Sequence, residues 1–398
     1  MLALNWRHGP DAGRSGNPEA AARPRSFSTP TARSRTHRAL AGFLFSTMRG
    51  KMPSIYSFEQ AMNAIAGSSK KHLLLGNGFS IALKPDIFTY GSLYDNADFS
   101  KSPRIPKIFD ALKTRDFELV VRSLEDTAVV LGIYDPKLSS IAARVQADAA
   151  AIKDALVSAI AKRHPDRPYD VTPEQYASCR AFLSRFDHIY TLNYDVLLYW
   201  ALMQDAVDEL LIRPDDGFRH PEDGRELPYV SWQQANSATV YYLHGALHLF
   251  DQHTEIIKYT WSKTDTAIVD QIRAALNENK YPLFVAEGTS ESKMERIMHS
   301  AYLHKALRSF ESCCSSSKNA VVIFGHSLAE NDSHVLKCIS GGGCANLLVG
   351  LYGDPTKKEN KEAIENAEFL VRERKSKRGD RFPLAVTFYD AATAKPWG

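Results

Sequence analysis

Short, unbroken apolar runs that stop at a glycine or a polar residue recur along the sequence, and they constrain the fold more than any other feature. Such runs lack the alternation of a strand with one face in water. They therefore predict strands covered on both faces, as in the parallel sheet of an α/β protein. The predicted strands are His72–Gly76, His188–Leu192, Thr239–Leu243, Leu283–Ala286, Ala320–Phe324, Leu347–Leu351 and Leu384–Phe388.

The sequence divides at about residue 51. Residues 1–51 are rich in Arg, Ser, Pro and Ala and have no sustained period, which predicts a disordered extension or a start codon assigned too far upstream. Their Arg-rich, acid-poor composition also resembles a mitochondrial transit peptide. Residues 52–398 carry the predicted strands and form the α/β domain. A helical pattern over about residues 97–186, with a capping box at Thr172–Gln175, predicts a helical insertion.

Charge and cysteine content exclude several classes of protein. Residues 1–50 contain eight arginines and two acidic residues, a charge of +6, whereas the net charge of the whole chain is only +3. Residues 51–398 are therefore slightly acidic, and nucleic-acid binding is not indicated. No stretch of apolar residues is long enough for a membrane-spanning helix. The five cysteines are odd in number and fit no zinc spacing, which predicts reduced thiols in a cytoplasmic protein and no metal.

Gly76-Asn77-Gly78-Phe79-Ser80 directly follows the first predicted strand. Its two glycines allow a tight turn and close approach of the backbone to a phosphate, and the free N–H groups of a helix beginning there would favour an anion. The dinucleotide fingerprint G-x-G-x-x-G is incomplete, because the residues after Ser80 are Ile-Ala-Leu. A simple strand-to-helix turn therefore remains the alternative.

Two polar side chains, Asn193 and Asp195, stand at the end of the second predicted strand. Polar groups beyond the carboxyl end of a parallel strand belong to the crevice in which α/β folds bind ligands. Asn193 can donate and accept, which suits a ribose hydroxyl or a water, whereas Asp195 can accept from a carboxamide. The alternative is an Asx-type turn that closes the strand.

His244 follows the third predicted strand, in the pair Leu243-His244-Gly245. An unperturbed pKa near 6.5 suits a general base at neutral pH. One alternative is a hydrogen-bonded histidine in a turn. The other is a metal site formed by His244, His248 and His253, which lacks the glutamate of a zincin motif.

A further small-residue turn follows the strand Ala320–Phe324. Gly325 and Ser327 in this turn can approach a ribose or phosphate from the opposite side of the crevice, and Asp332 follows shortly after. The segment Gly288-Thr289-Ser290 competes for the same role.

These four segments, in this order, resemble those of the sirtuin-like family over about residues 70–340. Two of the motifs, Asn193-Tyr194-Asp195 and Gly-x-Ser-Leu-x-x-x-Asp, resemble the bacterial sirtuin-like NAD hydrolases of anti-phage defence more closely than they resemble deacylating sirtuins. The paired Cys-x-x-Cys zinc module of deacylating sirtuins is absent, which argues against protein deacylation. The resemblance implies a doubly wound, Rossmann-like fold that binds oxidised NAD and cleaves its nicotinamide–ribose bond.

The resemblance also implies a role for each matching residue. Asn193 would orient water and the ribose, His244 would act as base, and Asp195 would hold the nicotinamide carboxamide. Gly76 to Ser80 would wrap the pyrophosphate. The ribose–phosphate side would be contacted by Gly325 and Ser327.

These roles predict a metal-independent NAD glycohydrolase that depletes NAD during infection. The alternative is a catalytically silent NAD or ADP-ribose sensor that regulates a partner. The resemblance further implies a homo-oligomer and allows for a partner ATPase, and no membrane or nucleic-acid partner is expected. Because unrestrained NAD hydrolysis would kill the host, we expect the helical insertion to carry a regulatory or oligomer surface.

Overall fold

The computed structural model describes most of the predicted α/β domain. The described residues are 52–85, 93–115, 117–161, 164–204, 207, 214–220, 229–233, 237–252, 255–260, 265–285 and 289–398. Contacts within the chain separate Met1–Lys51 from Met52–Gly398. The predictions made for residues 1–51 lie outside the described residues.

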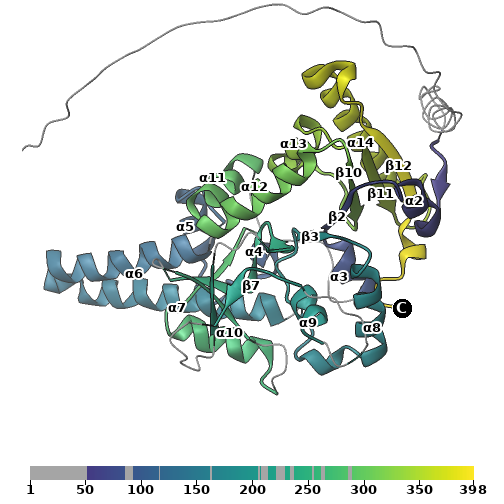
Figure 1. The fold of residues 1–398 in the computed structure, drawn as a ribbon. Coiled ribbons are helices and arrows are strands. Elements are labelled where there is room, and N and C mark those ends of the chain that lie inside the picture. Colours follow the sequence, from purple (N-terminus) through teal and green to yellow (C-terminus); the bar gives the residue numbers. More distant parts are fainter. Residues whose placement is uncertain are drawn as a thin grey trace, which may run out of the picture. The chain divides into compact units, whose positions relative to one another are not determined.

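The predicted parallel sheet is present, and helices flank it (Figure 1). Among the described residues it has seven strands in the order β1-β12-β11-β10-β2-β3-β6, and every neighbouring pair is parallel. All six residues of β10 are buried, as expected for a strand covered on both faces. The predicted doubly wound, Rossmann-like fold class is therefore confirmed. The strands are β1 (Ile55–Tyr56), β2 (Lys70–Leu75), β3 (His188–Thr191), β6 (Val240–Tyr242), β10 (Asn319–Phe324), β11 (Asn346–Leu351) and β12 (Ala385–Asp390).

A second sheet, which the apolar runs did not predict, is antiparallel and has the order β4-β5-β8-β7-β9 within the described residues. The prediction that Leu283–Ala286 joins the parallel sheet is wrong, because the strand formed there pairs with β7. An unbroken apolar run indicates burial but does not indicate the partner strand. The strands are β4 (Phe218–Arg219), β5 (Tyr229–Trp232), β7 (Gly245–Asp251), β8 (Ile256–Tyr259) and β9 (Pro282–Phe284).

Between β2 and β3 the described chain is helical, as the sequence predicts for about residues 97–186. The predicted capping box at Thr172 and Gln175 is formed at the start of α8. Two long helices of this region, α6 and α7, lie side by side (Figure 1). The helices before β3 are α2 (Phe58–Ala64), α3 (Gly78–Leu83), α4 (Leu93–Asn96), α5 (Ile105–Ala111), α6 (Phe117–Tyr134), α7 (Ser139–Ala161) and α8 (Pro173–Leu183).

The helices after β3 complete the layers around the two sheets. They are α9 (Leu197–Met203), α10 (Ile268–Asn277), α11 (Ser290–His299), α12 (Ala301–Ser315), α13 (Ser333–Gly341) and α14 (Lys358–Arg378). None of the described helices combines the length and the apolar content needed to cross a membrane. All five cysteines are buried free thiols.

The order of the strands reverses between β2 and β10. From β2 the chain adds β3 and then β6 toward one edge of the sheet, whereas β10, β11 and β12 follow one another toward the other edge. In open α/β sheets a reversal of this kind leaves a crevice outside the carboxyl ends of the strands, and ligands bind there. The loops that follow β2 and β10 therefore border the expected ligand site.

These two loops are in direct backbone contact. The Gly78 N–H donates to the Gly325 carbonyl at 2.8 Å, and the Gly76 N–H donates to the Phe324 carbonyl at 2.9 Å. A Cβ atom on Gly78 would lie 2.5 Å from the Gly325 Cα, and Gly325 has a φ of +70°. The packing of one loop on the other thus requires glycines here, whether or not a ligand binds.

Replacing Gly325 by alanine is expected to lower the free energy of unfolding by at least about 1–3 kcal/mol, the cost of a left-handed non-glycine residue. The new Cβ would also lie 2.6 Å from the Gly78 Cα. Urea denaturation measures the change. Gly132→Ala is the control, because nothing lies within 4 Å of that position on α6 and alanine there should be neutral or stabilising by about 0.5–1 kcal/mol. Equal stability of both variants would contradict the proposed loop packing.

A buried and a half-buried histidine lie side by side on neighbouring strands of the parallel sheet. His72 on β2 and His188 on β3 have ring centroids 5.0 Å apart. Neither ring nitrogen of His72 has a hydrogen-bond partner among the described residues. Burial, together with the nearby His188, lowers the pKa of His72 to about 4. The folded protein therefore keeps this ring neutral at a pH where the unfolded chain would protonate it.

We expect the protein to lose stability as the pH falls from about 6.5 to about 4. In that window the unfolded chain binds a proton at His72 that the folded chain does not bind, so acid favours unfolding. The contribution of His72 is at most about 1.4 kcal/mol per pH unit. The His72→Leu variant should show a flatter decline of unfolding free energy between pH 7 and pH 4.5 in urea titrations. An unchanged slope would mean that His72 is already protonated in the folded state.

Candidate active site

The predicted phosphate loop, Gly76 to Ser80, connects β2 to the short helix α3. The backbone N–H groups of Gly76, Gly78, Phe79 and Ser80 are already used: besides the two bonds described above, the Phe79 N–H donates to the Gly76 carbonyl and the Ser80 N–H donates to the Asn77 carbonyl, both at 3.0 Å. The expectation that these N–H groups are free for an anion is therefore not met in this structure. The Phe79 ring is buried against Trp397, with ring centroids 4.9 Å apart, and belongs to the core.

Ser80 joins the loop after β2 to the segment after β3. Its hydroxyl donates to Asp195 Oδ2 at 2.5 Å and accepts from Asn193 Nδ2 at 3.0 Å. The structure therefore brings together three residues that two separate sequence motifs predicted. No described residue donates to the Asn193 side-chain oxygen, so this oxygen is available to a ligand.

Asp195 also forms the Asx-type turn that was the alternative to a ligand-binding role. Its Oδ1 accepts from the Leu197 N–H at 3.0 Å, which is an Asx-type turn at the start of α9. Burial raises the pKa of Asp195, while the hydrogen bond from Ser80 opposes that effect. To hold a carboxamide, this carboxylate would have to share an oxygen with Ser80 or Leu197.

His244 lies beside the Asn193 segment. The Leu243 N–H donates to the Thr191 carbonyl at 2.9 Å, and the Leu247 N–H donates to the Tyr194 carbonyl at 2.8 Å, so the two strand ends run together. Gly245 has a φ of +70°, and a Cβ there would collide with the Leu283 carbonyl. The glycine of the His-Gly pair thus allows the chain to turn from β6 into β7, and His244 stands at that turn.

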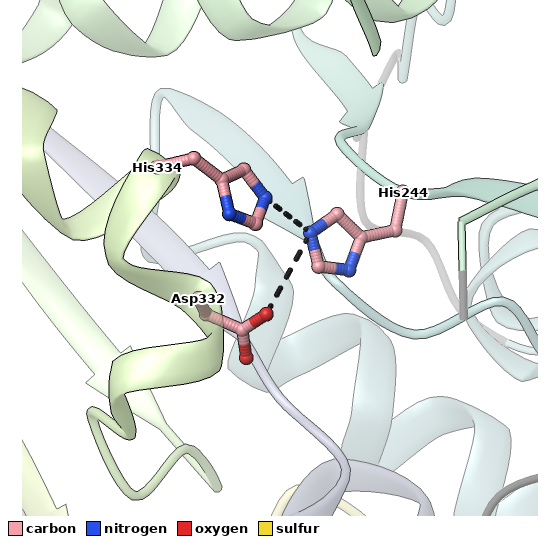
Figure 2. Close-up of side chains that lie close together, drawn as sticks. All are labelled: His244, Asp332 and His334. Carbon is pink, nitrogen blue, oxygen red and sulfur yellow. Dashed lines mark hydrogen bonds and ion pairs between the residues drawn. The ribbon is translucent and has the colours of Figure 1, made fainter. Parts of the chain in front are cut away.

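His244 belongs to a buried cluster that the sequence predicted only in part (Figure 2). Its Nε2 lies 3.0 Å from His334 Nε2 and 3.9 Å from Asp332 Oδ1. Asp332 in turn accepts from Lys293 Nζ at 2.7 Å and from His326 Nε2 at 2.9 Å. His334 lies in the first turn of α13, Lys293 lies on α11, and Asp332 ends the short 3₁₀ turn Glu330–Asp332.

The hydrogen bonds around Ser290 indicate which nitrogen of His334 carries the proton. The Ser290 hydroxyl oxygen accepts from the backbone N–H of His334 and from the Ser333 hydroxyl, both at 2.9 Å. With both lone pairs used, its proton faces His334 Nδ1 at 3.2 Å. The ring proton of His334 then sits on Nε2 and is donated to His244 Nε2. In this arrangement the Nε2 lone pair of His244 is occupied.

The electrostatics of the cluster keep both facing histidines neutral. Burial lowers the pKa of His244 to about 3 and that of His334 to about 4, while Asp332 opposes the effect at each ring. Burial acts to raise the pKa of Asp332, but the hydrogen bond from His326 and the charge of Lys293 outweigh it. The pKa of Asp332 is therefore well below its usual range.

The remaining predicted residues have mixed outcomes. Gly325 contacts Gly78, as described above, and Ser327 is exposed, with its carbonyl accepting from Asn366 Nδ2 at 3.3 Å. His248 does not take part in the alternative metal site of three histidines, because its ring stacks on that of Tyr199 with the ring centroids 4.4 Å apart. His253 lies outside the described residues.

A cavity of about 830 Å³ opens between the α5–α6 region and β9–α11. Phe117, Leu156, Phe284 and Arg296 are among its lining residues. None of the predicted site residues that the structure describes lines it. The cavity nevertheless borders the turn that carries His244, because the N–H of its lining residue Val285 donates to the His244 carbonyl at 2.7 Å.

Two solved structures of other proteins are similar to this chain at low identity and low TM-score. A complex of a Sir2 homologue with NAD is 14% identical, with a TM-score of 0.32 and coverage of 81% of this chain and 97% of its own. A Sir2 homologue with a histidine-to-asparagine substitution, in complex with ADP-ribose, is 15% identical, with a TM-score of 0.30 and coverage of 80% and 97%. TM-scores of this size assign no function to this chain.

No curated protein matches the sequence. The family described as "Domain of unknown function (DUF4917)" matches residues 73–397. Because this match spans most of the chain, the protein belongs to the DUF4917 family.

Proposed function

We propose that the protein binds oxidised NAD at the carboxyl edge of the parallel sheet and hydrolyses its nicotinamide–ribose bond. The observation that carries the proposal is the gathering of Ser80, Asn193 and Asp195 beside His244, next to the reversal of strand order. Ligands of open α/β sheets bind at such a reversal. Gly76 to Ser80 would border the pyrophosphate, and Gly325 with Ser327 would border the ribose.

The side chains present suit this reaction. Nicotinamide leaves as a neutral molecule, so the leaving group needs no acid, and the transition state carries positive charge on the ribose. No described residue donates to the Asn193 amide oxygen, so this oxygen can orient the attacking water. His244 is neutral at pH 7 and would accept the proton of that water, a role typically worth 10²–10⁴-fold. Asp195 would hold the carboxamide.

The proposal includes one rearrangement. His334 donates its Nε2 proton to His244 Nε2 in this structure, so the base becomes available only when His334 releases it. This feature favours the second candidate function, a sensor that binds NAD or ADP-ribose without turnover. The two candidates differ only in whether the bound nucleotide is cleaved.

Incubation of the full chain with NAD, followed by chromatography of the products, tests the proposal. The wild-type protein should yield nicotinamide and ADP-ribose, whereas His244→Ala and Asn193→Ala should reduce the rate at least about 100-fold, since each loses a group that acts on water. His248→Phe is the matched control, because this buried histidine of β7 stacks on Tyr199 outside the cluster, and it should keep the wild-type rate.

Each other outcome has a definite meaning. Intact NAD together with measurable binding would support the sensor. Neither binding nor turnover would overturn both candidates. Unchanged turnover per folded molecule in His244→Ala would show that this histidine is structural.

NAD depletion in anti-phage defence and control by assembly belong to the same proposal. The far end of the α6–α7 pair exposes apolar side chains, with Ile133 at 77% and Tyr134 at 85% exposure and Val129 and Val130 beside them. An exposed apolar patch of this kind is typical of an interaction surface. We expect a second copy of the chain to cover it, with or without a partner ATPase.

Ile133→Glu should therefore shift the protein toward monomer in sedimentation velocity, because a charge would have to be buried in the interface. Asp126→Lys, an exposed position on the same helix, is the charge control and should leave the assembly unchanged. Identical sedimentation of wild type and Ile133→Glu would remove this surface from the proposal.

A further inference from the structure

We propose that His244, His334 and Asp332 form a binding site for a divalent transition-metal ion, with zinc as the best match to the ligands. The three residues come from two separate segments: His244 from the turn before β7, and Asp332 and His334 from the 3₁₀ turn and the first turn of α13 that follows it (Figure 2). Two imidazoles and a carboxylate are a ligand set that zinc uses in sites with an open fourth position. The sequence predicted no metal.

The distances within the cluster are close to those of such a site. The candidate ligand atoms all lie within 4.8 Å of one another, with 3.0 Å between the two Nε2 atoms and 3.9 Å from His244 Nε2 to Asp332 Oδ1. Bonds of about 2.0–2.1 Å in a tetrahedron place neighbouring ligand atoms about 3.4 Å apart. The two distances from His244 Nε2 are each within about half an ångström of this value, and the third pair, at no more than 4.8 Å, would close by up to about 1.4 Å to complete the site.

The groups behind the ligands also fit. In metal sites the ligating histidines and carboxylates are held by further hydrogen bonds. Here Ser290 Oγ lies 3.2 Å from His334 Nδ1, and His326 Nε2 donates to Asp332 Oδ2 at 2.9 Å. Metal ligation through both Nε2 atoms would shift the ring proton of His334 from Nε2 to Nδ1. Ser290 Oγ would then accept from His334 Nδ1 in place of the Ser333 hydroxyl. Each neutral ring keeps one proton, so the two histidines release none.

Lys293 is the group that opposes metal binding. Its ammonium lies 2.7 Å from Asp332 Oδ1, the oxygen nearest to His244, and its side chain is buried. A divalent cation and this ammonium would repel each other strongly in a buried setting. We infer that Lys293 holds the Asp332 charge when no metal is bound and moves aside when metal binds. Removing the ammonium should then strengthen metal binding.

Metal at this site has a consequence that rests on the proposed function. A zinc ion on His244 Nε2 occupies the lone pair that would accept the proton of water. Zinc should therefore inhibit NAD hydrolysis, and a chelator should restore it. Metal binding itself does not depend on whether the protein hydrolyses NAD.

The test is a zinc titration of the chelator-treated full chain, monitored by competition with a chromogenic chelator, with elemental analysis after dialysis. Wild type should bind one zinc ion per chain at this site, and magnesium should not compete, because it prefers oxygen ligands. His334→Ala and the conservative His334→Gln should each weaken zinc binding at least about tenfold. Lys293→Met should strengthen it about tenfold. His248→Phe is the matched control and should bind as wild type does.

Absence of zinc binding in both wild type and Lys293→Met would overturn the site. Binding that survives both His334 substitutions would also overturn it, because the ion would then be held elsewhere. Circular dichroism shows whether each variant is folded. If zinc binds as expected but zinc-free wild type leaves NAD intact, the proposed function fails and the metal site stands. If zinc binds and hydrolysis is unaffected, the inferred inhibition is overturned.

Discussion

The common direction of the parallel strands is the constraint on which the rest of the structure depends. Because the described strands of this sheet are all parallel, the loops after β2, β3, β6 and β10 leave from the same edge. That edge brings Ser80 to Asp195 across 115 positions of sequence and His244 to His334 across 90. Long insertions between the strands, such as α4–α8, can therefore be accommodated without moving the site.

The glycines of the two central loops show how tightly this edge is packed. Gly78 and Gly325 each require the other to be glycine, because a Cβ atom at either position would collide with the backbone of the other. A glycine-rich turn after a buried strand is thus compatible with phosphate binding but does not require it. The stronger indication of a ligand site is the polar group formed by Ser80, Asn193 and Asp195, which is buried beside those loops.

The sequence predicted the sheet well because burial on both faces is encoded in single runs of residues. It could not assign Leu283–Ala286 to the correct sheet, since the partner of a strand is decided by tertiary packing. Asn193, Asp195 and His244 were predicted because each follows a strand. Lys293 and His334 were missed, because they lie on helices that reach the site only in the folded chain. The position of His334 two residues after Asp332 was the one available signal.

Burial of His244 affects its two proposed uses differently. Lowering the pKa from 6.5 to about 3 makes proton uptake by this ring less favourable by roughly 5 kcal/mol, even with Asp332 only 3.9 Å away. A weak base of this kind can take a proton from water only while the developing charge is shared with Asp332 and His334. Metal ligation, in contrast, uses the neutral ring, so the same burial removes the proton that would compete with a metal ion at neutral pH. The environment that limits His244 as a base therefore leaves it fully competent as a ligand, and Lys293 is the residue that decides whether Asp332 is free to join it.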